Sequence, residues 1–524
     1  MSQLTRVAER LLSIPRLSAL VLGALAATGF QPLGLWPLTL LGIAGLLALI
    51  ARAESAKRAA LLGWLFGVGH FTVGNTWIAT AFTYQAEMPA WLGWVAVVLL
   101  ALYLAVYPAL AALGGWLVAR RDARALVFAL AGCWIVSEWL RAWVFTGFAW
   151  NPLGVALLGP FDRPGLASLL PWLGTYALSG LTVLLGGAWW TALRGRRVDW
   201  RAAVLALGPF AAMLLPATGE RAEGTAAFTL AQPDVRQEAL NDPATFDAQF
   251  RRLAGLTAAK SPGQRRLVLW PESGVPDYLR GGYPEQYYLD TYGADPALAR
   301  QRIARAIGPG SMLLTGTVDL EIRGGKVAGA RNAVTALDAS GAIRGGYFKA
   351  HLVPYGEYLA LRWLLEPLGA SRLVPGAIDF WPGPGPRTLD LGDWGKVGTQ
   401  ICYEIIFSGE VVDGSHRPDF IFNPSNDGWF GASGPPQHLA QARLRAIEEG
   451  LPVLRATTTG ISAVIDADGI VRQHLPRHVA GRLDGLVPPA HPPTLFARLG
   501  NLLALGWALV FLGLSLVASR RGSR

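Results

Sequence analysis

The sequence predicts a polytopic α-helical membrane domain joined to an α/β or α+β domain outside the membrane. Hydrophobic residues make up 52% of the 524 residues, charged residues only 16%, and 20 residues are Trp. Long apolar runs fill the first 220 residues and return near residue 500. Between about residues 218 and 491, short β-rich runs alternate with helical periodicity. Such a mixture is long enough to form a core of its own.

The apolar runs approach the ~20 residues that a bilayer crossing needs. The first two are short and form either one helical hairpin or two modest spans. We predict a membrane domain over residues 1–217 with seven transmembrane helices, and an eighth helix with a basic cytoplasmic tail over 492–524. The runs cover residues 17–29, 34–50, 59–80, 91–117, 125–143, 165–190, 202–217 and 497–518.

Positive charge alternates along the membrane domain. The connections near residues 30–35, 81–90 and 144–164 carry almost no Arg or Lys. Because basic loops stay in the cytoplasm, this pattern places both termini there and residues 218–491 outside. The formal charge of +10 lies in short clusters between apolar runs, so it indicates membrane loops rather than a nucleic-acid partner. The basic clusters are Arg6/Arg10/Arg16, Arg52/Lys57/Arg58, Arg120/Arg121/Arg124, Arg194/Arg196/Arg197/Arg201 and Arg520/Arg521/Arg524.

Polar residues gather at the predicted outer ends of the spans. Glu138 and Arg141 lie three apart on the fifth span, a spacing that favours pairing on one helix face. The segments 75–77 and 145–151 combine Asn, Thr and aromatic residues. One interpretation is contact with a lipid substrate, since charge inside a membrane is costly unless used or paired. The other is ordinary anchoring at the headgroup zone.

The outer domain shows both kinds of element. Helical periodicity covers residues 243–260, 296–306 and 436–449, and Gly450 is a suitable C-cap for the last helix. The predicted strands lie near 228–230, 266–270, 312–317, 334–337, 396–398, 420–422, 453–456 and 461–465.

A single cysteine, Cys402, follows one of these strands. Such a thiol can project into a cleft, although a lone Cys on an apolar strand is also a common core residue. The other cysteine, Cys133, lies in a predicted span, so a disulfide between the two is disfavoured.

Two other strand patterns end in charge, at Glu272 and at Lys349. Each alone is typical of an exposed strand end. Together with Cys402 they supply a base, a cation for an oxyanion, and a nucleophile, which is what thiol acyl chemistry requires.

The order Glu272, Lys349, Cys402 resembles the carbon–nitrogen hydrolase (nitrilase) superfamily, and the eight spans make the chain similar to the apolipoprotein N-acyltransferases of bacterial inner membranes. The resemblance implies an αββα sandwich over residues 218–491. One departure is Leu240-Asn241, where a Lys-Trp pair is expected before Asp242-Pro243. The motifs are Trp270-Pro271-Glu272, residues 349–357, Ile401-Cys402-Tyr403-Glu404, residues 423–430, Gln437-His438 and residues 455–462.

The resemblance further implies an acyl transfer from a phospholipid to the N-terminal amine of a diacylglyceryl-cysteine apolipoprotein, through a thioester on Cys402. Glu357, Tyr403 and Glu404 would support the site or bind substrate. Neither a cofactor nor a metal is expected, and we expect a monomer in the inner membrane with its catalytic domain in the periplasm.

Two insertions suit lipid substrates. One carries five tyrosines within 278–292, and the other carries Leu359, Leu361, Trp363, Leu364, Leu365 and Leu368. We predict mobile arms that cover the cleft and touch the membrane. The alternative is ordinary packing of long connections.

Two other functions remain open at this point. A membrane-tethered amidase or nitrile hydrolase would use the same three residues with water as acceptor. A transporter or receptor would use the outer domain only to bind ligand.

Overall fold

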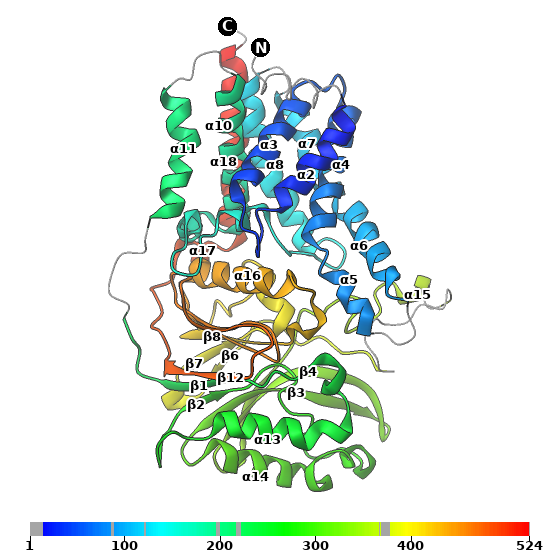
Figure 1. Ribbon diagram of the computed structural model, residues 1–524, viewed down its shortest axis with the longest axis vertical. Coiled ribbons are helices and arrows are strands. Elements are labelled where there is room, and N and C mark those ends of the chain that lie inside the picture. The colour runs from blue at the N-terminus through cyan, green and yellow to red at the C-terminus, as the bar shows by residue number, and fades with distance from the viewer. Residues whose placement is uncertain are drawn as a thin grey trace.

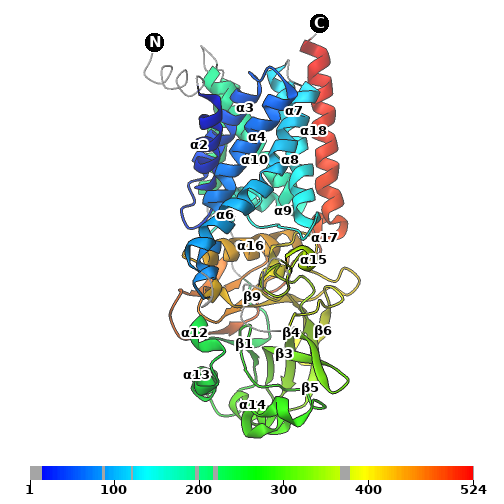
Figure 2. The same cartoon turned by 90° about the vertical axis from the view of Figure 1, so that its right-hand side faces the viewer.

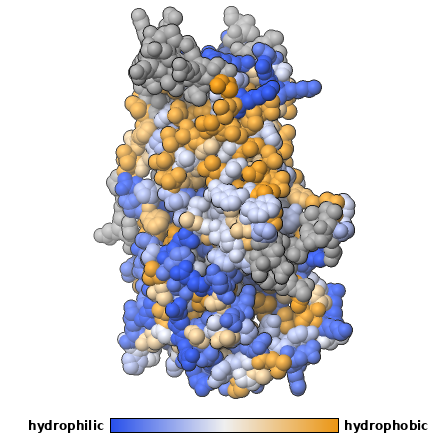
Figure 3. All heavy atoms as spheres, turned by 45° about the vertical axis from the view of Figure 1, so that its right-hand side comes forward, coloured by the Kyte–Doolittle hydropathy of each residue, from blue (hydrophilic) through white to orange (hydrophobic). Residues whose placement is uncertain are grey.

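The computed structural model describes residues 14–84, 89–119, 122–194, 200–215, 222–365, 367 and 378–522. A bundle of helices stands on a layered α/β domain, and α16 (Gly434–Glu449) lies at the junction (Figure 1). On the face that Figure 3 shows, hydrophobic residues dominate the bundle and hydrophilic residues the other half. The predicted basic residues at 6–10, 120–121, 196–197 and 524 lie outside the described residues.

The helices of the bundle follow the apolar runs. Four are long and apolar enough to cross a membrane: α8, α10, α18 and the stretch Trp91–Ala119, which contains α6 and α7; α2 and α3 are shorter apolar helices. The predicted sixth run is divided, because Gly174 (φ 73°) ends α9 before α10 begins. The bundle contains α2 (Pro15–Ala27), α3 (Trp36–Ile50), α4 (Ala56–Gly74), α5 (Ile78–Ala81), α6 (Trp91–Leu104), α7 (Val106–Ala119), α8 (Ala123–Trp143), α9 (Leu170–Leu173), α10 (Thr175–Arg194), α11 (Trp200–Leu214), α17 (Leu495–Leu499) and α18 (Asn501–Gly522).

The three connections with almost no Arg or Lys all contact the α/β domain. Phe30 packs in the same apolar cluster as residues of α16. The ring of Tyr84 lies 5.8 Å from that of Trp429, and the Trp150 indole donates a hydrogen bond to Gln437. These connections therefore share one end of the bundle, whereas α18 runs from the α/β domain to the opposite end (Figure 2).

The α/β domain contains two six-stranded sheets. Their strand orders are β12-β1-β2-β3-β4-β5 and β11-β10-β9-β8-β7-β6. Every predicted strand and helix of the domain is present, and Gly450 (φ 66°) caps α16 as expected. The strands are β1 (Ala227–Gln232), β2 (Leu267–Leu269), β3 (Met312–Arg323), β4 (Lys326–Asp338), β5 (Ile343–Phe348), β6 (Thr388–Asp390), β7 (Lys396–Thr399), β8 (Phe420–Ser425), β9 (Val453–Thr457), β10 (Ser462–Ile465), β11 (Val471–Leu475) and β12 (Gly481–Leu486), and the further helices are α12 (Gln237–Leu240), α13 (Phe246–Thr257), α14 (Pro296–Ile307) and α15 (Arg362–Leu365).

Alternation along the strands builds the layers. In the first sheet, Leu267 and Leu269 face the second sheet, and Val268 between them packs beneath α13 and α14. In the second sheet, Phe422 faces the first, and Ile421 packs against α16. The cluster that contains Ile421 continues into the bundle, so α16 is buried between the second sheet and the membrane helices.

The two insertions that are predicted to form mobile arms differ in how they pack. In the tyrosine-rich segment, the hydroxyls of Tyr283 and Tyr287 accept hydrogen bonds from backbone N–H groups of β3 and β4. This segment is packed on the sheet, so the prediction of a membrane-touching arm is wrong there. In the other insertion, Trp363 and Leu364 on α15 are 76% and 44% exposed, and α15 lies at the level where the bundle meets the sheets (Figures 1 and 2). Leu368 lies outside the described residues.

Candidate active site

Three strand ends bring Glu272, Lys349 and Cys402 together. Each residue follows its strand, β2, β5 or β7, within three positions. The Lys349 Nζ lies 3.7 Å from Glu272 Oε1, and the Cys402 thiol is within electrostatic range of both charges. All three are buried, with exposed fractions of 7%, 2% and 6%. The three residues, which lie at the ends of separate strands in the sequence, thus form one buried cluster.

The backbone at Cys402 is strained. Its φ is +50°, where β7 has ended and the 3-10 helix η9 (Cys402–Ile406) begins. Ser273, directly after Glu272, also has a positive φ of 53°. Such conformations cost on the order of 1–3 kcal/mol for an L-residue and concentrate at functional sites.

Two asparagines orient the Glu272 carboxylate. The Asn332 Nδ2 on β4 donates to Oε1 at 2.7 Å, and the Asn426 backbone N–H donates to Oε2 at 2.7 Å. The Asn332 amide also donates to Glu357 Oε1 at 2.8 Å. Sequence reasoning missed Asn332, because a single polar residue on a strand carries no local signal.

Lys349 has two carboxylate neighbours. Its Nζ lies 2.9 Å from Glu357 Oε2, closer than from Glu272. Burial acts to lower the pKa of Lys349, but the charges of Glu357 and Glu272 outweigh burial and raise the pKa. The side chain is therefore an ammonium throughout the physiological pH range.

The resting state of Cys402 is the thiol. Burial, and next the charge of Glu272, raises its pKa well above the usual value, while Lys349 acts in the opposite direction. Such a thiol must lose its proton as it attacks, which requires an adjacent base.

Glu404 joins the lysine strand to the cysteine turn. Its Oε1 accepts hydrogen bonds from the Tyr347 hydroxyl at 2.7 Å and from the backbone N–H groups of Ala350 and His351. Its Oε2 accepts from the Ile401 N–H at 2.7 Å. Burial raises the pKa of Glu404 to about 7. Glu404 therefore holds the segment around Lys349 and the turn at Cys402 together.

Tyr403 faces the bundle. It is 4% exposed, its ring stands edge-on to Phe407 at 5.2 Å, and its hydroxyl lies 3.5 Å from the Gly147 carbonyl oxygen. Asn241, at the departure from the family pattern, is an exposed residue that ends α12.

Glu138 and Arg141 have separate hydrogen-bond partners. Glu138 Oε1 accepts from the Trp134 indole and from the Leu153 N–H, and Arg141 Nη1 donates to the Trp150 carbonyl at 2.8 Å. Both residues thereby order the connection after α8. Trp150 in this connection and Trp77 between α4 and α5 both pack on the α/β domain, since each contacts Phe430.

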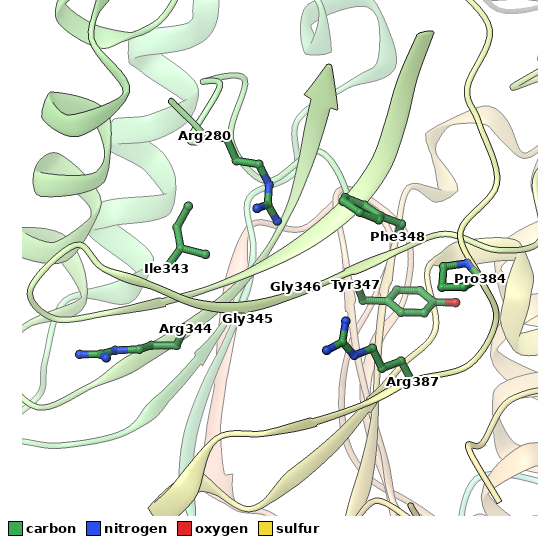
Figure 4. A pocket seen from close by; sticks show the side chains of 9 residues that line it. All are labelled: Arg280, Ile343, Arg344, Gly345, Gly346, Tyr347, Phe348, Pro384 and Arg387. Atoms are coloured by element: carbon green, nitrogen blue, oxygen red, sulfur yellow. The ribbon is translucent and has the colours of Figure 1, made fainter. Parts of the chain in front are cut away.

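A cavity of about 410 Å³ lies beside the exposed edge of β5, apart from the three side chains. Arg280 and Arg387 approach the Gly345–Gly346 backbone from opposite sides (Figure 4). Tyr347 links this cavity to the site, because its hydroxyl contacts Glu404. The lining residues are Arg280, Ile343, Arg344, Gly345, Gly346, Tyr347, Phe348, Pro384 and Arg387.

Comparison with known proteins covers both domains. Residues 22–188 match the apolipoprotein N-acyltransferase N-terminal domain, and residues 226–481 match the carbon-nitrogen hydrolase family. An amidase from Nesterenkonia sp. is a structural neighbour at 19% identity and a TM-score of 0.36, covering 54% of this chain and 96% of that one.

Full-length relatives are also found. The chain is 36% identical to an apolipoprotein N-acyltransferase of Rhodopseudomonas palustris over 96% of this chain and 94% of that protein. It is 37% identical to the apolipoprotein N-acyltransferase of Bradyrhizobium diazoefficiens over 96% and 95%. This chain therefore belongs to the apolipoprotein N-acyltransferase family.

Proposed function

We propose that this protein transfers a fatty acyl chain from a phospholipid to the N-terminal amine of a diacylglyceryl-cysteine apolipoprotein, through a thioester on Cys402. The observation that carries the proposal is the buried convergence of Glu272, Lys349 and Cys402 in a member of this family. A base, a cation and a thiol are the groups that acyl transfer through a thioester needs.

In the first half-reaction, Glu272 takes the thiol proton as Cys402 attacks the ester carbonyl of the phospholipid. The Lys349 ammonium, together with the backbone N–H of Tyr403, stabilises the tetrahedral oxyanion. The C–O bond of the ester then breaks, and Glu272 returns the proton to the lysophospholipid oxygen. The products are lysophospholipid and a thioester on Cys402.

In the second half-reaction, the apolipoprotein amine attacks the thioester carbonyl. Glu272 accepts a proton from the amine, the C–S bond breaks, and the proton returns to the Cys402 sulfur. The new bond is an amide, and the free thiol is restored. Because both substrates meet the same acyl-enzyme, the kinetics are ping-pong.

The proposed location is the bacterial inner membrane, with eight crossings, both termini in the cytoplasm and a periplasmic αββα domain. Support comes from the three connections poor in Arg and Lys, which all contact the α/β domain. Members of the predicted basic clusters lie at the opposite end: Arg52 between α3 and α4, Arg58 in the first turn of α4, and Arg520 and Arg521 at the end of α18.

The test measures whether Cys402 acquires an acyl group and passes it on. Purified protein is incubated with a phospholipid labelled in its acyl chain, and Cys402 is examined by peptide mass spectrometry. We expect label on Cys402 that persists in water and moves to an added diacylglyceryl-cysteine peptide. Cys402→Ala should abolish the label, and Cys133→Ala should retain it. Rapid loss of the label to water would instead indicate a hydrolase.

A further inference from the structure

A buried polar cluster lies behind the cysteine turn, and the acyl-transfer steps above do not use it. It contains His438 on α16, Arg455 on β9, Asn423 on β8, and Asp427, which follows β8. The exposed fractions of these side chains are 0–1%. Burying a charged group costs free energy unless its hydrogen bonds are satisfied, so the partners of each group indicate what the cluster does.

One part of the cluster contacts the backbone carbonyl of Cys402, the proposed nucleophile. The His438 Nε2 lies 2.9 Å from the Cys402 carbonyl oxygen. A carbonyl only accepts hydrogen bonds, so Nε2 must carry a proton. Burial, and next the charge of Arg455, lowers the pKa of His438, whereas the charge and hydrogen bond of Asp427, whose Oδ1 lies 3.0 Å from Nδ1, act to raise it.

Arg455 and Asp427 both contact the other ring nitrogen of His438. Arg455 Nη2 and Asp427 Oδ1 each lie 3.0 Å from Nδ1. The same Nη2 lies 2.8 Å from both carboxylate oxygens of Asp427. The Asp427 carboxylate thus binds both the guanidinium and the imidazole, and the three groups hold one another in place.

Another part of the cluster holds the backbone two residues before Cys402, at Gln400. Arg455 Nη1 donates to Asn423 Oδ1, and Asn423 Nδ2 donates to the Gln400 carbonyl at 2.6 Å. The carbonyls of Gln400 and Cys402, on either side of Ile401, are therefore both held by groups bound to Arg455. The peptide between them has little freedom to rotate.

Helix α16 also anchors the rest of the turn. Arg445 Nη1 donates to the Ile406 carbonyl, and Glu448 accepts from the Ser408 hydroxyl at 2.8 Å. With His438, three side chains of one helix bind the segment 402–408. That helix is itself packed against the membrane bundle.

We propose that His438 is a positioning residue, whose Nε2–H holds the Cys402 carbonyl and so keeps the nucleophile in its left-handed conformation facing Glu272 and Lys349. Arg455 and Asp427 hold the ring in the orientation that points Nε2 at this carbonyl. The proposal rests on the proposed acyl transfer through Cys402. What it adds concerns only the backbone conformation of Cys402.

The experiment compares two amides that differ by one methylene. In a Cys133→Ala background, where Cys402 is the only thiol, His438→Gln places an N–H within reach of the Cys402 carbonyl, whereas His438→Asn is too short. Gln441→Leu is the matched control, because Gln441 is a buried residue of α16 whose side chain donates to the Gln437 carbonyl. The rate of iodoacetamide alkylation and the rate of acyl-enzyme formation are both measured, together with the unfolding midpoint.

We expect His438→Asn to slow both rates by about ten- to a hundredfold, with the KM for phospholipid unchanged, because the thiol loses its alignment and the carbonyl its donor. His438→Gln should recover most of both rates, and Gln441→Leu should retain them. Equal rates in the folded Gln and Asn variants would overturn the proposal. A wild-type protein that alkylates at Cys402 but never acquires an acyl group would refute acyl transfer instead.

Discussion

The indole N–H of Trp150 donates a hydrogen bond of 2.8 Å to the amide oxygen of Gln437. Trp150 belongs to the connection after α8, and Gln437 precedes His438 on α16, so this bond joins the helical bundle to the α/β domain. Both side chains are buried. Trp150→Phe keeps the ring but leaves the Gln437 oxygen without this donor.

We therefore expect Trp150→Phe to lower the free energy of unfolding by about 1–3 kcal/mol, measured by denaturation in detergent. Trp172→Phe is the control, because Trp172 is 58% exposed. If the two variants unfolded alike, the bond between the domains would have no energetic importance.

Glu357→Gln removes the nearer negative charge from Lys349. The ammonium then loses its nearer partner and is held less firmly where it would meet the oxyanion. The rate of acyl-enzyme formation should fall about tenfold, which corresponds to ~1.4 kcal/mol of barrier. Mass spectrometry of Cys402 in time-quenched samples measures this rate. The exposed carboxylate Glu285, changed to Gln, is the control; a wild-type rate for Glu357→Gln would contradict the argument.

Glu404 should make stability depend on pH. Its folded-state pKa is raised by burial from 4.5 to about 7, so between these values the folded state holds a proton that the unfolded state has lost. The stabilising contribution is complete below pH 4.5 and is lost as the pH rises through about 7. Thermal unfolding midpoints should accordingly decline over this interval. Glu404→Gln should flatten the decline, and an unchanged slope in that variant would assign it to another group.

Trp363 and Leu364 should help the protein take phospholipid from a membrane. Their exposed apolar surfaces lie on α15 beside the bundle. Changing both to Ala should raise the KM for vesicle phospholipid about tenfold without lowering the unfolding midpoint. Leu289→Ala is matched in exposure, at 74%, but lies in the segment packed on β3 and β4. Equal KM values in both variants would exclude a role for α15.

The sequence predicted local features well and long-range partners poorly. Gly450 was identified as a helix cap because capping depends on a few consecutive residues. The sequence predicts a membrane arm at the tyrosines near 283, since nothing in their spacing shows that β3 and β4 supply partners for their hydroxyls. Glu138 and Arg141 interact electrostatically, as their spacing predicts, but the spacing does not show that each also binds the connection after α8.

The sequence by itself determined where apolar runs form helices, and which three strand ends carry a carboxylate, an ammonium and a thiol. These features follow from hydropathy and from the period of two along a strand. Only the tertiary structure brings Asn332, His438 and Arg455 beside the three strand ends and places Glu404 between Tyr347 and Ile401. Their partners lie on other strands and helices, and hydrogen bonds between distant segments leave no periodic trace in the chain.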